Sequence, residues 1–349
     1  MRRALASIAI LTAATFLPPA SASHAETGSC GRTCLSGVAD AVLASMVAHD
    51  PAHLPLARTY AATENAVPAA LGMMTLWRTA TAAKSKYYII DPESRQLFMI
   101  ASIAEGPNDT LLFGRLKVEA GLLSEIELYT NHSRGQGGFQ FDGDGPSHFP
   151  AAWTVALRPE QRMSRSQLLQ AGRSIFDTGV TGPEASEQCV LMENGKVVAE
   201  DPEVFKAVGP PSDPGAPKPK PRAPNPDGTL SIPCGSPAER PTDPAARTDI
   251  VDEEQGVVVS IATVQGIAEP YLVTNPTLSA FVPNQLLRPY ADMLKKQQAS
   301  GVYTAPALRP MKAGGTVAQV HRIFDGKVQG MQLLVNLGAP GLTSPWVNQ

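Results

Sequence analysis

Residues 118–126 read Val-Glu-Ala-Gly-Leu-Leu-Ser-Glu-Ile, and residues 323–331 read Ile-Phe-Asp-Gly-Lys-Val-Gln-Gly-Met. Each stretch sets an acidic-glycine turn between apolar residues. Two further anchors precede it in the same order in both halves of the chain. They are residues 63–65 and their echo 192–194, and residues 90–93 ahead of an apolar run and their echo 251–254. This shared order predicts an internal duplication, because repeats are detected as self-similarity along the chain.

The first residues have the pattern of a secretory signal. Met1-Arg2-Arg3 supplies positive charge, residues 4–17 are apolar, and small residues allow cleavage after Ala22 or Ala25. The apolar run is too short to span a bilayer. The alternative is a buried N-terminal helix. We expect residues 1–25 to be a cleaved signal peptide and the mature protein to be secreted or periplasmic, with no transmembrane segment.

The net charge and the cysteine content limit which partners and which cysteine bonds are expected. The net charge of −3 argues against nucleic acid or an anionic membrane as the main partner. Four cysteines in an exported chain favour disulfides over metal thiolates, and they allow three pairings. A zinc site of four thiolates is the alternative, but such a site normally shows two close pairs of cysteines.

The first copy has an α+β pattern. Apolar residues at helical spacing predict a helix over residues 34–47, with Thr33 as its cap. Asp50 and Pro51 suit the start of a short second helix. Strand-like runs separated by turn residues follow, at residues 87–90, 97–104, 111–118 and 122–129. A helix followed by an antiparallel meander is typical of an α+β domain.

The second copy begins with a capping box at residues 164–167 and a hydrophobic staple between Met163 and Leu168. Two insertions interrupt it, a proline-rich one at 201–247 and a second at 266–315. We expect an extended, exposed segment in the first insertion and a surface helix at 283–298 in the second. The predicted organisation is a first domain at 26–135, a linker at 136–162 and a second domain at 163–349.

Several motifs together carry a family resemblance. They are the Cys-x-x-x-Cys-Leu start at residues 30–35, the Ala-His-Asp-Pro stretch at 48–57, Thr-Glu-Asn at 63–65 and the acidic motif at 250–256. The chain resembles a tandem family of exported proteins without an established activity, found in fungi and bacteria, within the SnoaL-like (nuclear-transport-factor-like) superfamily. Ala66 departs from the Gly that usually follows the Thr-Glu-Asn motif.

The resemblance implies two tandem cone-shaped domains, each a curved antiparallel sheet wrapped on N-terminal helices around a mostly apolar pocket. In the superfamily some members are isomerases, cyclases or hydrolases that need no cofactor, and others only bind. The resemblance also implies the disulfides Cys30–Cys34 and Cys189–Cys234. One physical argument supports the second pair: it would tether the proline-rich insertion and close a loop of about 45 residues.

Three residues are candidates for proton transfer. Glu64 and Glu193 fall at matching positions of the two copies, and an inward carboxylate in an apolar cone would act as a general base. The alternative is that both glutamates bond to the backbone at the rim. His321 falls where the first copy has Leu116, and a polar residue at an apolar position hints at function in the second copy.

Trp77, Arg78 and Tyr87 are candidates for lining a pocket in the first copy, although aromatic residues at such spacing are more often core. Residues 49–53, His-Asp-Pro-Ala-His, resemble a helical zinc motif, but Pro51 prevents one continuous helix face. We therefore expect neither a metal site nor a cofactor.

Two functions remain open from the sequence. The leading one is binding, or conversion without a cofactor, of a small apolar or amphipathic molecule in one cone. The alternative is a non-catalytic envelope or interaction protein whose cones are filled by side chains.

Overall fold

The computed structural model describes residues 30–132, 153, 156–177, 179–194, 196–197, 199–200, 230–231, 234, 243–268, 296, 299–301 and 311–347. The predicted signal peptide, most of both insertions and most of the linker lie outside these residues. So do the proline-rich stretch 210–226 and the predicted surface helix apart from Lys296.

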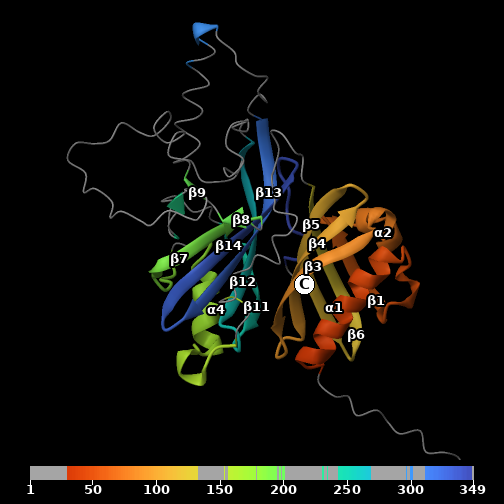
Figure 1. Ribbon diagram of the computed structural model, residues 1–349, viewed down its shortest axis with the longest axis horizontal. Helices are drawn as coiled ribbons and strands as arrows, with labels where there is room; N and C mark the ends of the chain where they lie inside the picture. Colours follow the sequence, from red (N-terminus) through yellow and green to blue (C-terminus); the bar gives the residue numbers. More distant parts are fainter. Residues whose placement is uncertain are drawn as a thin grey trace, which may run out of the picture.

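The first unit, residues 30–132, has helices on one side of a six-stranded sheet (Figure 1). Its helices are α1 (Arg32–Val47) and α2 (Thr75–Thr79), with 3-10 turns at Pro51–His53 and Leu71–Met73. Its strands are β1 (Leu56–Glu64), β2 (Val67–Pro68), β3 (Ala82–Asp91), β4 (Gln96–Glu105), β5 (Asn108–Glu119) and β6 (Leu122–His132). The sheet order is β2-β1-β6-β5-β4-β3, and β1 runs parallel to β6.

The second unit, from residue 156 to β14, repeats this plan. It has a 3-10 turn at Pro159–Gln161 and the helix α4 (Arg165–Arg173). Its strands are β7 (Ala185–Glu193), β8 (Lys196–Val197), β11 (Arg247–Asp252), β12 (Val257–Ala268), β13 (Met311–Phe324) and β14 (Lys327–Gly338). The short strands β9 (Ala199–Glu200) and β10 (Leu230–Ser231) pair separately. Together the two units confirm the predicted mixed α+β class.

The strand order of the second sheet, β8-β7-β14-β13-β12-β11, is that of the first sheet strand for strand. β7 also runs parallel to β14, as β1 does to β6. The recurring turn is equivalent as well. Ala120 and Gly121 in one unit, and Asp325 and Gly326 in the other, all have positive φ, as a two-residue hairpin turn requires.

Local sequence signals explain the helix starts. Asp50 accepts a hydrogen bond from the Ala52 amide, as expected, and Ser164 with Gln167 forms the predicted capping box. The predicted Thr33 cap was wrong: α1 begins at Arg32, with Gly31 in the cap position and no side-chain cap. Because no side chain caps this helix, its first residue cannot be recognised from a capping residue in the sequence.

Both insertions are shorter than their predicted bounds. Arg247 is already part of β11, so the first insertion ends before it. The segments 266–268 of β12 and 311–315 of β13 continue the hairpin by pairing with each other, for example Ala268 with Met311. Sequence reasoning stopped these strands too early because glycines such as Gly314 and Gly315 resemble loop residues.

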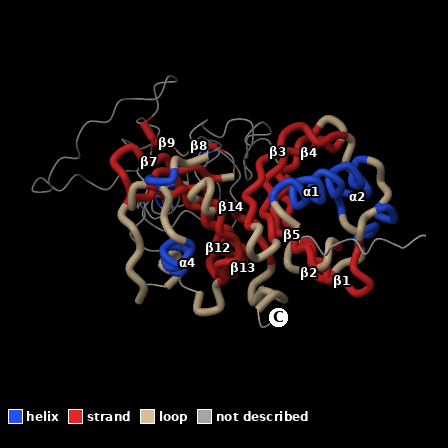
Figure 2. Tube along the Cα trace, turned by 90° about the horizontal axis from the view of Figure 1, so that it is seen from below, coloured by secondary structure: helices blue, strands red, loops and turns tan. Residues whose placement is uncertain are grey.

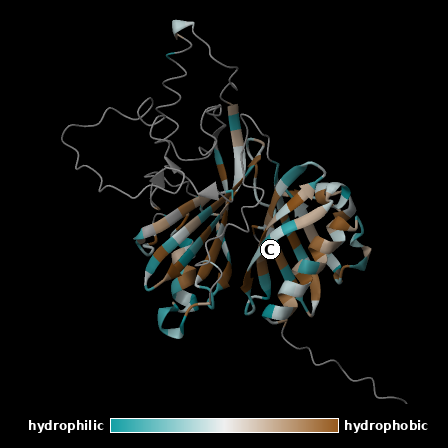
Figure 3. Cartoon of the chain, viewed as in Figure 1, coloured by the Kyte–Doolittle hydropathy of each residue, from teal (hydrophilic) through white to brown (hydrophobic). Residues whose placement is uncertain are grey.

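The two sheets pack face to face, with the helices on the outer sides (Figure 2). Between the sheets lies one apolar cluster with members from both units, including Phe98, Phe113 and Tyr129 from the first and Val259 and Val320 from the second. A second cluster fills the space between α1, α2 and the first sheet. The second unit has smaller clusters on its helix-covered face. Apolar residues run along the strands of both sheets (Figure 3).

Both expected disulfides are present. Cys30 is joined to Cys34 at the start of α1. Cys189 on β7 is joined to Cys234, and both are buried in the cluster under α4. The second bond therefore attaches a residue of the first insertion to the helix-covered face of the second sheet.

Candidate functional site

Glu64 and Glu193 end equivalent strands, as predicted. Glu64 pairs with Leu128 of β6, and Glu193 pairs with Leu333 of β14. The Glu64 carboxylate accepts hydrogen bonds from the Thr75 amide at 2.8 Å and the Thr75 hydroxyl at 3.1 Å. It therefore caps the start of α2, in accordance with the backbone-bonding alternative.

The three predicted pocket residues of the first unit do not share one site. Trp77 is buried among the side chains between α1 and the first sheet, where its Nε1 donates to Ser45 Oγ at 3.1 Å. Arg78 is exposed. Tyr87 lies on the opposite face of the sheet, between the two units, with its hydroxyl 2.9 Å from the carbonyl oxygen of Trp153.

His321 lies on the helix-covered face of the second sheet. Its register partners are Met331 of β14 and Val258 of β12, and both pack in the apolar cluster beneath α4. The same row in the first unit contains Leu116, with the partners Ile126 and Leu97. The register thus confirms that His321 replaces Leu116 of the first copy.

The neighbouring row, two residues along each strand, has more polar side chains in the second unit than in the first. It runs from Glu193 through Leu333 to Gln319 and Ser260. The equivalent row of the first unit is Glu64, Leu128, Gly114 and Met99.

Gln319 and His321 form a buried pair. Each is 6% exposed, and His321 Nε2 lies 3.1 Å from Gln319 Oε1. Ser260 donates to the carbonyl oxygen of Gly172 in α4 at 2.9 Å, which joins this row to the helix above it. Buried polar groups are costly unless they are hydrogen-bonded, so these three, beside the apolar cluster under α4, distinguish this face from that of the first unit. We refer to Ser260, Gln319 and His321 as the polar row.

The first unit has no room for such a row. A Cβ atom added at Gly114, the counterpart of Gln319, would overlap the backbone oxygen of Glu127. Gln319 and Ser260 were not predicted from the sequence, because one polar residue in a strand carries no signal by itself. A strand-by-strand alignment of the two copies would have set Gln319 against Gly114 and Ser260 against Met99.

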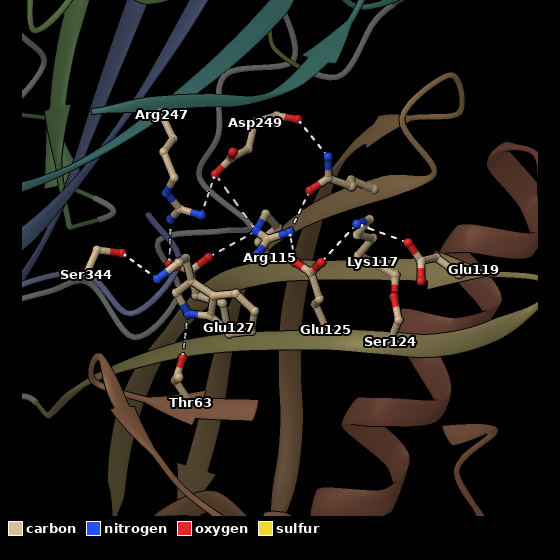
Figure 4. A network of polar contacts seen from close by, with 12 residues as sticks. Thr63, Arg115, Lys117, Glu119, Ser124, Glu125, Glu127, Arg247, Asp249 and Ser344 are labelled. Carbon is tan, nitrogen blue, oxygen red and sulfur yellow. Dashed lines mark hydrogen bonds and ion pairs between the residues drawn. The ribbon is translucent and has the colours of Figure 1, made fainter. Parts of the chain in front are cut away.

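A second polar cluster lies between the two units (Figure 4). Arg115 contacts Glu127 at 3.0 Å and Glu125 at 2.6 Å, while Arg247 of β11 contacts Glu127 at 2.8 Å and Asp249 at 3.1 Å. Both Arg115 and Glu127 are buried. Since each charge faces an opposite one, this network joins the first sheet to β11 rather than presenting a free group.

The C-terminal segment covers this network. The Trp346 ring lies 4.9 Å from the Arg115 guanidinium carbon, and its Nε1 donates to Thr63 Oγ1 at 3.0 Å. The second unit has Val320 and Gln332 at the positions equivalent to Arg115 and Glu127, so the network breaks the symmetry of the repeat.

The pKa values of two carboxyl groups of the network are shifted in opposite directions. Burial raises the pKa of Asp249, although Arg247 and Arg115 oppose that effect. Burial also acts to raise the pKa of Glu125, but Arg115 and Lys117 outweigh it and lower the pKa. We therefore expect the contribution of each of these two carboxyl groups to stability to depend on pH.

Among the residues that the structure describes, no group of three or more His, Cys, Asp or Glu is placed to hold a metal ion. Asp50 of the His-Asp-Pro sequence caps a turn, and His49 Nδ1 lies 3.0 Å from the carbonyl oxygen of Trp77. No helix in the described part of the chain is long and apolar enough to cross a membrane.

The chain matches no protein-family model, no curated protein and no solved structure in our comparisons. The assignment of function therefore rests on the residues themselves.

Proposed function

We propose that this exported protein binds a small apolar or amphipathic molecule at the helix-covered face of its second unit. One observation carries the proposal: the Gln319–His321 pair is buried where the first unit has Gly114 and Leu116. Small-molecule sites are mostly apolar with a few polar groups that orient the ligand, and the polar row has this composition.

The first unit serves as a scaffold in this proposal. Its helix-covered face holds one continuous apolar cluster, which includes Leu35, Met46, Trp77 and Leu112. Glu64, its one candidate base, is occupied by Thr75. If the protein is an enzyme, His321 is the group that would transfer protons without a cofactor, with Glu193 in the neighbouring row.

The proposed fold family is the SnoaL-like superfamily, with each unit a cone. Three features support it: helices ahead of the sheet, the repeated strand order with its parallel β1–β6 and β7–β14 pairs, and the equivalent Glu64 and Glu193. The two disulfides are compatible with export, since such bonds persist in oxidising compartments.

A thermal-shift screen of the mature chain against a metabolite library tests the proposal. A ligand of the native state raises the melting temperature by mass action. The double variant Gln319→Leu/His321→Leu should abolish the shift given by a hit. The control Glu64→Gln, in the first unit, should retain it.

Hits that still stabilise the double variant would place the ligand elsewhere. Glu64→Gln losing the shift would move the site to the first unit. The second candidate function, a non-catalytic interaction protein, is favoured by the filled first unit. It predicts that no small molecule in the library shifts the melting temperature.

A further inference from the structure

The two disulfides differ in their exposure and in the length of chain that they close. Cys189 and Cys234 are 2% and 9% exposed in the cluster under α4, and their sequence separation is 45. Cys30 is also buried, at 5% exposure, but Cys34 is exposed, and their separation at the start of α1 is 4. Cys34 is therefore accessible from solvent, whereas a reaction at the Cys189–Cys234 bond requires the core to open.

Arginines fix the starts of the two equivalent helices. Arg32, the first residue of α1, contacts both carboxylate oxygens of Asp252 at 2.9 and 2.7 Å. Arg165, the first residue of α4, contacts both oxygens of Asp91 at 2.9 and 2.7 Å. Bidentate arginine–carboxylate pairs have a fixed geometry. Since α4 contains no cysteine and is held in this way, the disulfide at α1 is not required to position a helix of this kind.

The disulfide lies at the capping positions of α1. Counted from the first residue of each helix, Cys34 corresponds to Gln167. In α4 the Gln167 side chain accepts a hydrogen bond from the amide of Ser164, the cap residue, at 2.9 Å. In α1 the cap residue is Gly31, and the helix has no side-chain cap and no acidic residue in its first turn. The amides at this end therefore lack the side-chain acceptor that α4 has.

Reduction of the disulfide would supply an acceptor at this end. A thiolate at Cys34 is an anion in the first turn of the helix, where the free amides and the helix dipole stabilise negative charge. A disulfide sulfur has no charge, so this stabilisation exists in the reduced state alone. A disulfide whose reduced form is stabilised is a stronger oxidant.

We propose that Cys30 and Cys34 are a redox-active pair that exchanges disulfides with accessible cysteine thiols of another polypeptide. A thiolate of the partner attacks Cys34 Sγ, the bond between Cys30 and Cys34 breaks, and Cys30 leaves as a thiolate. The second thiol of the partner loses its proton and attacks the partner sulfur that is bonded to Cys34, and Cys34 leaves as a thiolate.

The exchange is balanced in electrons and protons. The dithiol of the partner loses two electrons and becomes a disulfide, and the Cys30–Cys34 disulfide gains them and becomes a dithiol. The protons released by the partner thiols pass through solvent to the new thiolates. This pair lies in the first unit, apart from the polar row of the second unit.

The bond between Cys189 and Cys234 is the matched control within the same chain. The unmodified protein is equilibrated in glutathione buffers from both the oxidised and the reduced side, and its free thiols are alkylated and mapped by mass spectrometry. At a fixed concentration of oxidised glutathione, half reduction of Cys30–Cys34 should need at least about threefold less reduced glutathione than half reduction of Cys189–Cys234. A Cys30–Cys34 bond that needs as much reduced glutathione as the control, or more, overturns the proposal.

Single variants test which sulfur is attacked. Cys30→Ser leaves the thiol of exposed Cys34, and Cys34→Ser leaves the thiol of buried Cys30. With a synthetic peptide that carries one disulfide, Cys30→Ser should form the mixed disulfide at least about tenfold faster than Cys34→Ser. Equal rates, or a faster reaction of Cys34→Ser, contradict attack at Cys34 and overturn the proposal.

The exchange itself is measured with a synthetic peptide that carries two reduced cysteines. The unmodified protein in its disulfide form should oxidise this peptide, and the double variant Cys30→Ser/Cys34→Ser, which keeps the Cys189–Cys234 bond, should not. Oxidation of the peptide at the same rate by both proteins, or by neither, overturns the proposal. The glutathione equilibrium uses the unmodified protein, so it decides the proposal even where a variant does not fold.

Discussion

The two units share a strand order but differ in where they place polar side chains. The first unit has an apolar helix-covered face and a charged network toward its neighbour, built on Arg115 and Glu127. The second unit reverses this distribution, with Val320 and Gln332 toward its neighbour and Gln319 and His321 on the helix-covered face. The comparison teaches that equivalent positions of a repeat reveal specialisation that neither copy shows by itself.

The largest effect on stability should come from breaking the two arginine–aspartate pairs that join the units. We expect Asp91→Ala and Asp252→Ala each to lower the free energy of unfolding by about 3–5 kcal/mol. Each substitution removes the carboxylate that pairs with an arginine and with a buried amide of an edge strand. The two losses should agree within about 1 kcal/mol if the two pairs are equivalent. Urea unfolding of the full chain measures both.

The controls for this pair are Glu93→Ala and Glu254→Ala. These glutamates contact the same arginines, but the side chain of Glu93 is 69% exposed and that of Glu254 is 46% exposed, so each substitution should cost no more than about 1 kcal/mol. A large difference between Asp91→Ala and Asp252→Ala would show that the repeat is symmetric in geometry but not in energy.

The next largest difference between the units should be in how much each disulfide contributes to stability. The Cys189–Cys234 bond closes a loop with a sequence separation of 45, whereas the separation of Cys30 and Cys34 is 4. Replacing both cysteines of a pair by Ser opens the corresponding loop. In the chain-entropy model the losses are about 4 and about 2 kcal/mol. Denaturation of the two double variants under non-reducing conditions checks the order. An equal loss would mean that loop length does not decide the contribution of these bonds.

A smaller effect should distinguish the two helix-covered faces. Leu116→His places an imidazole in the first unit, where Gly114 offers no side-chain partner, and should cost about 1–3 kcal/mol. Gln319→Leu/His321→Leu removes both partners of a hydrogen bond together and should change stability by less than about 1 kcal/mol. Thermal unfolding compares them. A tolerated Leu116→His would mean that the first face accepts polar groups too.

Local signals in the sequence predicted much of the scaffold. The capping box at Ser164, the Asp50 cap and the equivalence of Glu64 with Glu193 depend on residues close along the chain or on the repeat itself. Asp91 and Asp252 accept hydrogen bonds from the Ser94 and Gln255 amides, and an aspartate that starts a turn in this way is also a local signal.

The arginine–aspartate pairs and the polar row could not be predicted in the same way. Arg32 and Asp252 are separated by 220 positions, and no local pattern brings them together. The polar row depends on register across β7, β14, β13 and β12, and a shift of one residue would reverse every side chain. Only an alignment of the two copies by strand would have supplied that register.

The pH dependence of stability gives the smallest and most specific test, because the second unit has Val320 and Gln332 where the first unit has Arg115 and Glu127 of the network. The pKa of Glu125 is lowered, so its stabilisation is present above its ordinary pKa of 4.5 and is lost as the pH falls through the folded value. The pKa of Asp249 is raised, so its contribution to stability is present below pH 3.8 and is lost as the pH rises through the folded pKa.

Glu125→Gln should therefore destabilise the protein near neutral pH by no more than about 1 kcal/mol, and the difference from the unmodified protein should fade in acid. Asp249→Asn should become more stable relative to the unmodified protein as the pH rises, since the amide carries no buried charge. Unfolding free energies measured between about pH 3 and pH 7 resolve the two slopes. Slopes of the same sign would mean that Arg115, Lys117 and Arg247 hold both carboxylates charged, and that burial of Asp249 does not control its titration.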